Sequence, residues 1–230
     1  QMQRLEGIGT LASGIAHDLN NMLTPVLKAS QILKSKVTDA RQLQLLDRIE
    51  RSAMRGADVV KQVLTFARGA KGERVPIQVK PLVRETVKVC EEPFPRSIQI
   101  ETHIDDHVCS VVGDSTQIHQ VVLNLCLHAR DAMPEGGVLA ITADNVDLGA
   151  DFGAVHPEAN PGRYVRIGVS DTGAGMSGEV MEHLFEPFFT TKADGTGLGL
   201  STVYGIVRSL GGHVSAESRV GLGTTFRVYL

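Results

Sequence analysis

The sequence predicts two structural classes in one chain: an α-helical hairpin, followed by an α/β sandwich in which helices cover one face of a mixed sheet. Three observations support this prediction. Residues 1–68 carry a heptad pattern of apolar residues almost free of helix breakers. Residues 69–76 are polar and contain Gly and Pro, which is typical of a linker. Residues 77–230 alternate short β-rich runs with helical segments.

The apolar residues of the first segment recur at alternating steps of three and four from Leu5 to Leu33, which predicts one long helix. After a short turn near residues 37–39, a second helix with the same spacing runs to about Arg68. A second apolar stripe widens its face: Leu46, Ala53, Val60 and Ala67. Two helices with faces this wide cannot bury them against each other alone. We therefore expect residues 1–68 to form a homodimer as a four-helix bundle, although a generic coiled-coil hairpin would show the same heptads.

Beyond the linker, alternating apolar residues and turn signals define the elements of the second half. Strands are expected at residues 98–104, 138–146, 164–170, 213–218 and 224–230. Helices are expected at residues 116–133 and 197–210, and a loop rich in Gly, Pro and Ala at 147–163. Together these elements predict one sheet with helices on one face.

The composition excludes several classes of protein. A formal net charge of -3 argues against a nucleic-acid binder, and an aromatic content of 4% without Trp argues against a base-stacking surface. The three cysteines show no CxxC spacing, so we expect buried apolar residues in a reducing compartment. No apolar run approaches the ~20 residues that span a bilayer. We expect a cytoplasmic chain without membrane contact, with any sensor or membrane anchor outside these residues.

Three glycine-rich segments lie in the second half: residues 171–176 (DTGAGM), 195–200 (GTGLGL) and 221–226 (GLGTTF). Glycine lets backbone N–H groups approach a ligand closely, and the N-terminus of a helix attracts phosphate. Asp171, at the end of a predicted strand, can accept a hydrogen bond from an adenine amino group. None of the segments fits a Walker A or Rossmann pattern. Any one alone is more often a turn than a ligand loop.

In this order, and together with residues 120–125 (QVVLNL) and 186–192 (EPFFTTK), the three segments resemble the N, G1, F, G2 and G3 boxes of the histidine-kinase ATPase domain. The superfamily also includes the Hsp90, gyrase and MutL ATPases. The resemblance implies a Bergerat-type α/β sandwich that binds ATP. Asp171 would hold adenine, and the stretch between the first two glycine segments would form a lid. Lys192 would add positive charge near the phosphates, although a solvated lid lysine is equally consistent with its position.

The resemblance implies contacts to the nucleotide from a larger set of residues. They are Asn124, His128, Asp131, Asp171, Gly173, Gly175, Met176, Lys192, Gly195, Thr196, Gly197, Leu198, Gly199, Leu200 and Thr225.

Residues 12–21 (ASGIAHDLNN) resemble the H box of a histidine-kinase dimerisation domain, in its His-Asp-x-Asn-Asn subgroup. The heptad register places His17 at position f, on the outside of the bundle. The resemblance implies in-line phosphoryl transfer from ATP to Nε2 of His17. Asp18 would accept the Nδ1 proton. Asn21, four residues after His17 on the same helix face, would position water for dephosphorylating the partner, the receiver domain of a response regulator.

One position departs from the family pattern. The N box normally has a second Asn four residues after the first, but here Asn124 is followed by His128. In the superfamily that second Asn gives a carbonyl oxygen to Mg²⁺, a hard ion that prefers oxygen ligands. Three readings remain, in this order of preference. Either Asn124, water and phosphate hold Mg²⁺, or Mn²⁺ serves better because it accepts nitrogen more readily, or the site binds nucleotide feebly.

These readings lead to competing functions. The first is an ATP-dependent histidine kinase that passes phosphate to a response-regulator aspartate and also acts as a regulator phosphatase. The second is a degenerate kinase, with weakened Mg-ATP binding, that acts as a phosphatase or scaffold. A third, a chaperone-like clamp ATPase, is disfavoured by the H box in front of the heptad hairpin.

Overall fold

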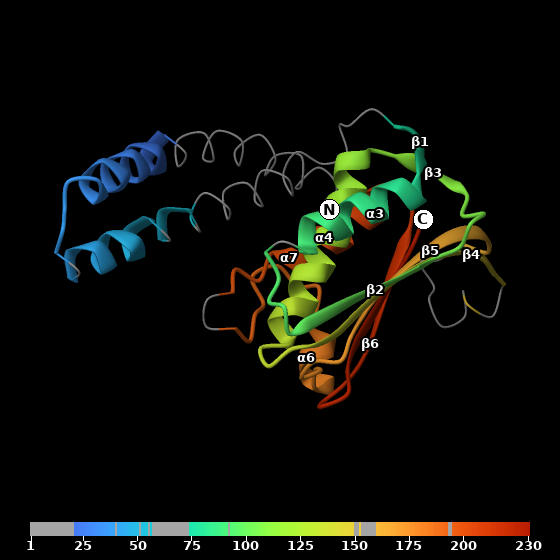
Figure 1. Cartoon of the computed structure of the whole chain (residues 1–230). Coiled ribbons are helices and arrows are strands. Elements are labelled where there is room, and N and C mark those ends of the chain that lie inside the picture. Colours follow the sequence, from blue (N-terminus) through green and yellow to red (C-terminus); the bar gives the residue numbers. More distant parts are fainter. Residues whose placement is uncertain are drawn as a thin grey trace. The chain divides into compact units, whose positions relative to one another are not determined.

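The computed structural model describes residues 21–39, 41–50, 52–54, 56, 74–91, 93–149, 152, 160–192 and 195–230. The chain divides into two compact units, residues 1–69 and residues 70–230. Figure 1 shows a helical first unit and a second unit of sheet and helices. Two predicted functional residues, His17 and Asp18, lie outside the described residues.

The described part of the first unit is a helical hairpin. Residues 21–34 and 41–50 are helical, and helix continues at 52–54 and 56. The carboxylate of Asp39 accepts a hydrogen bond from the backbone N–H of Gln42 at 2.9 Å and so caps the second helix. Lys34 on the first helix joins the two helices through ion pairs with Asp47 at 2.6 Å and Glu50 at 3.0 Å. The two helices are joined by residues 35–39, which agrees with the turn predicted near residues 37–39.

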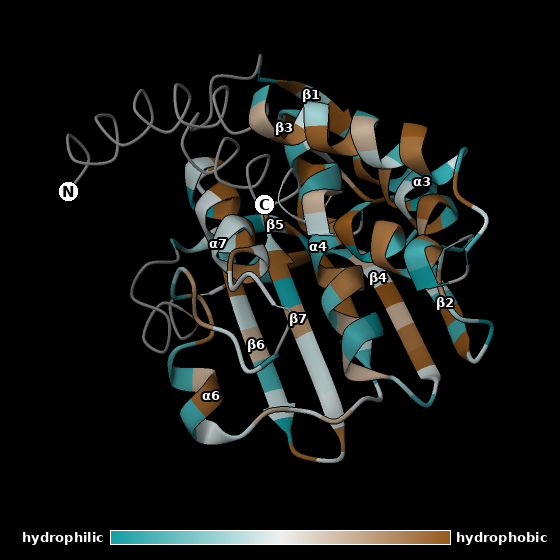
Figure 2. Cartoon of the chain, turned by 90° about the vertical axis from the view of Figure 1, so that its left-hand side faces the viewer, coloured by the Kyte–Doolittle hydropathy of each residue, from teal (hydrophilic) through white to brown (hydrophobic). Residues whose placement is uncertain are grey.

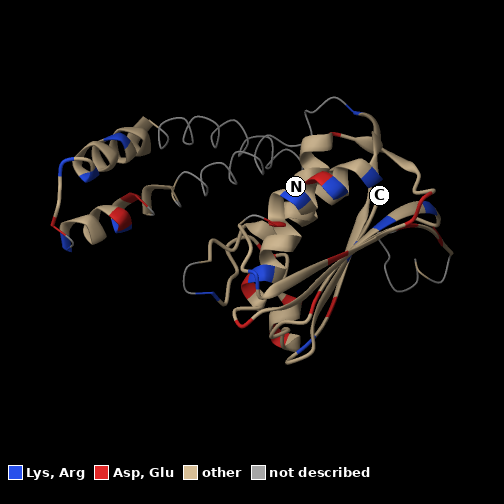
Figure 3. Ribbon diagram, viewed as in Figure 1, with Lys and Arg blue, Asp and Glu red and all other residues tan. Residues whose placement is uncertain are grey.

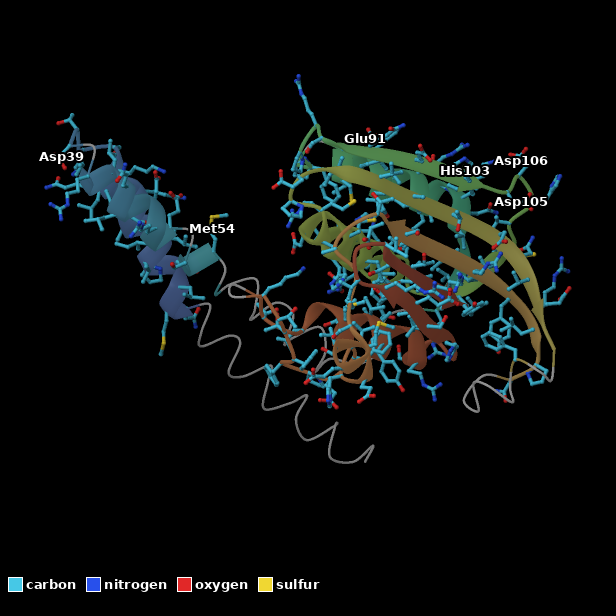
Figure 4. The ribbon with its side chains drawn as sticks, turned by 90° about the horizontal axis from the view of Figure 1, so that it is seen from below. Asp39, Met54, Glu91, His103, Asp105 and Asp106 are labelled. Atoms are coloured by element: carbon cyan, nitrogen blue, oxygen red, sulfur yellow. The ribbon has the colours of Figure 1, made fainter. Side chains whose placement is uncertain are left out.

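The hairpin leaves most of its large apolar side chains uncovered. Leu46 and Ala53, from the second predicted stripe, are buried. Among its described residues, the exposed large apolar ones are Met22, Val26, Ile32, Leu33, Leu45, Ile49 and Met54. Met54 projects outward in Figure 4. The hairpin therefore has the wide uncovered face that the heptads predict, and its burial in a dimer stays a prediction.

The second unit is built on a five-stranded sheet with the strand order β2-β4-β5-β7-β6. Its elements are β1 (Val75–Gln78), α3 (Val79–Glu91), β2 (Ile98–Ile104), β3 (Ser110–Gly113), α4 (Ser115–Ala132), β4 (Gly137–Leu148), β5 (Gly162–Asp171), α6 (Gly178–Glu182), α7 (Gly199–Ser209), β6 (His213–Arg219) and β7 (Gly223–Tyr229). Strands β2 and β4 are parallel, and the other neighbours in the sheet are antiparallel. Strands β1 and β3 form a separate antiparallel ribbon.

Helices α3, α4 and α7 lie together on one face of the sheet (Figure 2). Alternate residues of the central strands point into this layer and are fully buried, among them Ile141, Ile167 and Phe226. The helices supply the other side of the core, with Val83 from α3, Val122 from α4 and Val203 from α7. The predicted two-layer α/β sandwich is therefore confirmed.

The five predicted strands correspond to β2 and β4 to β7, and the two predicted helices to α4 and α7. Four elements were not predicted: β1, α3, β3 and α6. Strand β1 begins at Val75, within the last residues of the predicted linker. The cysteines are free thiols, as expected; Cys90 and Cys126 are buried and Cys109 is half-buried.

Charged residues of both signs are interspersed over the described parts of both units (Figure 3). Within those parts, no helix combines the length and the apolar composition needed to cross a bilayer.

Candidate nucleotide site

The predicted glycine segments meet at one end of the sheet, around the end of β5. The backbone N–H of Ala174 donates to the carbonyl of Ala132 at the end of α4, at 2.9 Å. The N–H of Gly221, in the turn between β6 and β7, donates to the carbonyl of Ala174 at 2.7 Å. The N–H of Met176 donates to Oγ of Ser218 on β6 at 2.8 Å. The first and third glycine segments are therefore joined, and the first is fixed to α4.

Asp171 is buried at this end of the sheet, and only 4% of the residue is exposed. Its Oδ1 accepts the backbone N–H of Gly173 at 2.8 Å. The backbone N–H of Thr224, on the neighbouring strand, also bonds to the carboxylate. Burial disfavours the ionised form and raises the pKa of Asp171, although both hydrogen bonds act in the opposite direction. A fixed, buried acceptor of this kind suits the amino group of a base.

Three glycines around Asp171 allow backbone segments to pass too closely for any side chain. A Cβ at Gly173 would overlap the carbonyl of Ala132, and one at Gly175 would overlap the carbonyl of Arg219. A Cβ at Gly223 would overlap the carbonyl of Asp171 itself. Gly175 and Gly223 also have positive φ angles, 66° and 90°. Gly223 and Thr224 were not among the predicted contact residues, because their contribution depends on how β7 pairs with β5.

The second glycine segment opens α7 beside α4. The Nδ2 of Asn124 donates to the carbonyl of Gly199, the first residue of α7, at 3.3 Å. Space is open around Gly199, where an added Cβ would meet nothing within 4 Å. Gly197, with φ of 66°, packs against the backbone of Phe188, whose N–H donates to the Gly197 carbonyl at 3.0 Å. The N-terminus of α7 therefore presents open backbone next to Asn124, which is favourable for phosphate.

His128 lies one helical turn after Asn124 on α4. Its ring stands edge-on to Phe226 of β7, with centroids 5.5 Å apart and an interplanar angle of 87°. Burial lowers the pKa of His128 to about 4; the charge of Lys192 acts in the same direction, and Asp131 opposes them. The imidazole is therefore neutral near pH 7.

A group of three charges, the Asp131 triad, lies at the end of α4. The Asp131 carboxylate bonds to Arg130 at 2.7 Å and to Lys192, from the predicted lid region, at 3.0 Å. Burial acts to raise the pKa of Asp131, but the hydrogen bonds from Arg130 and Lys192 outweigh it, so the pKa is lowered. Sequence reasoning did not single out Arg130.

The described residues contain no group of three or more His, Cys, Asp or Glu side chains that could hold a metal ion. The groups that could coordinate a metal ion here are Oδ1 of Asn124, whose Nδ2 bonds to Gly199, and a ring nitrogen of the neutral His128. One amide oxygen and one imidazole nitrogen suit Mn²⁺ better than Mg²⁺. The remaining ligands would come from water and phosphate.

The structure brings most of the predicted contact residues into this one region of the second unit. Asn124, His128 and Asp131 lie on α4, Thr225 bonds to Ser170 beside Asp171 at 2.8 Å, and residues 195–200 lead into α7. Asn21 is exposed on the first helix of the hairpin. Other acidic groups lie elsewhere: Figure 4 shows Glu91 at the end of α3, and Asp105 and Asp106 in the turn after β2.

Comparisons with known proteins agree with this geometry. Residues 8–72 match the His Kinase A (phospho-acceptor) domain, and residues 113–230 match the histidine kinase-, DNA gyrase B-, and HSP90-like ATPase family. The sensor kinase CckA of Brucella abortus is 37% identical over the whole of this chain, which covers 25% of that relative. The sensor protein FixL of Bradyrhizobium diazoefficiens is 30% identical, again over the whole chain, which covers 44% of its length. The chain thus spans less than half of these curated relatives.

Solved structures point the same way. Histidine kinase ThkA, in complex with the response regulator protein TrrA, matches all of this chain and 63% of the ThkA chain, with a TM-score of 0.67 and 26% identity. Full-length ShkA, in complex with AMPPNP, shares the fold with a TM-score of 0.76 over 96% of this chain and 45% of its own, at 24% identity. With a phosphoacceptor domain, an ATPase domain and these relatives, the chain belongs to the two-component sensor histidine kinases.

Proposed function

We propose that the chain uses ATP to phosphorylate His17 and that the phosphate then passes to an aspartate in the receiver domain of a response regulator. The observation that carries this proposal is the position of the buried Asp171 carboxylate at the same end of the second unit as the open N-terminus of α7 beside Asn124. An adenine acceptor and a phosphate-binding helix end are the two parts that an ATP site needs. The AMPPNP complex of ShkA and the ThkA complex with TrrA support the ligand and the partner.

In this proposal each element has a separate task. Asp171 orients the base, and Gly173 and Gly175 let the backbone close around it. Backbone N–H groups at residues 197–200 neutralise phosphate charge, which is the main requirement of phosphoryl transfer. Asn124 and His128 would hold the metal, Mg²⁺ or Mn²⁺, which neutralises charge on the phosphates. Met176, Gly195, Thr196 and Thr225 would contact the same nucleotide.

The first unit supplies the acceptor. We propose that residues 1–68 form the homodimer, that 69–76 are the linker, and that 77–230 are the catalytic domain. The exposed apolar face of the hairpin, which includes Leu33, Leu45 and Ile49, supports the dimer. Asp18 would fix the tautomer of His17, and Asn21, exposed on the hairpin, would orient water in a phosphatase reaction. Because the reaction consumes ATP, we place it in the cytoplasm.

The test is incubation with γ-labelled ATP in Mg²⁺ or in Mn²⁺. We expect acid-labile label in the wild type and none in His17→Gln. Asp171→Asn is expected to lose nucleotide binding and keep the dimer. If Asp171→Asn bound nucleotide with unchanged affinity, the assignment of the base to Asp171 would be wrong. Absence of label in the wild type with both metals, and a gain of label in His128→Asn, would establish the degenerate kinase instead.

A further inference from the structure

The ion pair between Asp131 and Lys192 joins residues 61 positions apart, one on α4 and one in the segment that precedes the second glycine motif. We propose that Asp131 is a positioning residue that holds Lys192 in the nucleotide-free site and yields it to the phosphates of a bound nucleotide. Asp131 thereby lowers affinity for phosphorylated ligands and leaves affinity for adenosine unchanged. This inference rests on the proposed function, because it concerns the same ATP site.

The two oxygens of the Asp131 carboxylate have separate partners. Oδ1 accepts both Nε and Nη2 of Arg130, at 3.0 and 2.7 Å, while Oδ2 accepts Nζ of Lys192 at 3.0 Å. The Arg130 guanidinium also lies over the ring of Phe94, 5.5 Å from its centroid, and Phe94 is buried. Arg130 is therefore held on two sides. Lys192 is the partner that can leave.

Breaking the ion pair between Lys192 and Asp131 would cost little free energy. The side chains of Lys192 and Asp131 are both 38% exposed, and ion pairs this accessible contribute little to stability. After Lys192 leaves, Arg130 still neutralises Asp131, so no unpaired carboxylate remains in a half-buried position. A phosphate group carries more charge and more acceptor oxygens than one oxygen of a carboxylate that Arg130 already neutralises, so it competes well for an ammonium group.

Hydrogen bonds fix the backbone of Lys192, whereas its side chain is held by the exposed ion pair with Asp131. The N–H of Lys192 donates to Oγ1 of Thr190 at 3.1 Å, and its carbonyl accepts the N–H of Gly195 at 3.1 Å. The Lys192 side chain is directed at α4, where Asn124, His128 and Asp131 are spaced four and then three residues apart and share one face. The ammonium group of Lys192 thus lies on the face of α4 whose Asn124 bonds to Gly199 at the start of α7.

The test is calorimetric titration of the full chain, in Mg²⁺, with AMPPNP, ADP and adenosine. We expect Asp131→Asn to bind AMPPNP and ADP about three- to fivefold more tightly, the range that release of a half-exposed ion pair supports. Arg130→Gln leaves Lys192 as the only cation on Asp131, so we expect it to weaken binding of both by a similar factor. In a Lys192→Gln background, Asp131→Asn is expected to have no effect. Adenosine affinity should not change in any variant.

A matched control is Asp106→Asn, which breaks another lysine–aspartate pair of the same unit, Lys80–Asp106 at 2.6 Å between α3 and the turn after β2. It should leave all three affinities unchanged. Arg130→Lys keeps the charge, so wild-type affinities in that variant would show that loss of the positive charge causes the Arg130→Gln effect.

If nucleotide affinity changed in the same direction in Asp131→Asn and Arg130→Gln, or if adenosine affinity changed as much as nucleotide affinity, Asp131 would have a merely structural role. Either result would overturn the proposed exchange, in which Lys192 leaves Asp131 for the phosphates. If the wild type bound adenosine and nucleotides but Asp131→Asn did not change the ratio of their affinities, the exchange alone would fail. If the wild type bound none of the three, the proposed function would fail and the exchange with it.

Discussion

Replacing His128 by Asn should remove an acid sensitivity from the second unit. The half-buried imidazole stands edge-on to Phe226, and its pKa is lowered to about 4. An unfolded chain would restore a value of about 6.5. Between these two values the unfolded state binds the proton and the folded state does not. The stabilising neutral form is therefore fully present above about pH 6.5, and stability is lost as pH falls toward 4.

The size of the effect follows from that difference. Each pKa unit is worth about 1.4 kcal/mol, so protonation of His128 in the unfolded chain lowers the free energy of unfolding by about 2 kcal/mol between pH 7 and pH 5. At pH 4 the loss reaches about 3 kcal/mol. Asparagine does not titrate, so the variant should lack this share of the pH dependence. The remaining carboxylates and histidines contribute equally to both proteins and cancel in the comparison.

Urea unfolding followed by tyrosine fluorescence measures this in the full chain. The sequence has no Trp and three Tyr residues, Tyr164, Tyr204 and Tyr229, and all three lie in the second unit. The signal therefore reports the unfolding of that unit alone. His103→Asn, at an exposed histidine on β2, is the matched control and should follow the wild type. Parallel pH curves for wild type and His128→Asn would refute the reasoning, because they would mean that His128 titrates alike in both states.

Four further substitutions or measurements test separate parts of the structure. Gly175→Ala should lose AMPPNP binding in calorimetry, because φ is 66° and the new Cβ would overlap backbone. Gly178→Ala, where an added Cβ meets nothing within 4 Å, should bind normally. Asp114→Ala removes the N-cap of α4 and should lower the free energy of unfolding by about 1 kcal/mol. Cys126, fully buried, should react with a thiol reagent only after urea unfolding.

The periodicity of apolar residues predicted the elements that are long or strictly alternating. It did not predict the short elements. Strand β3 has four residues, and α6 has five, too few to show a repeat. Helix α3 is different, because its buried residues Val79, Leu82, Val83 and Thr86 follow the helical spacing. That signal was present in the sequence and could have been found. Pro81 in its first turn, where a proline is tolerated, does not argue against a helix.

Some residues of the candidate site could be predicted from the sequence, and others could not. Asp171 and the glycines could be named in advance, because a motif fixes their order along the chain. Ser218, which accepts the N–H of Met176, and the ion pair between Lys192 and Asp131 could not be. Their roles depend on the pairing of β6 with β7 and on which face of α4 meets the lid segment. Contacts between distant segments of this kind follow from packing, and no local pattern in one sequence encodes them.

Asp171 and His128 make stability depend on pH in opposite directions. Burial raises the pKa of Asp171 above its unfolded value, so the folded state holds this proton more tightly and loses stability as pH rises through the folded pKa. Relative to Asp171→Asn, the wild type should therefore become less stable between pH 4 and pH 7, measured by the same urea unfolding. A difference that grew in favour of the wild type over that range would show that the hydrogen bonds from Gly173 and Thr224 outweigh burial. A buried carboxylate that costs stability near pH 7 is consistent with a group kept for binding rather than for folding.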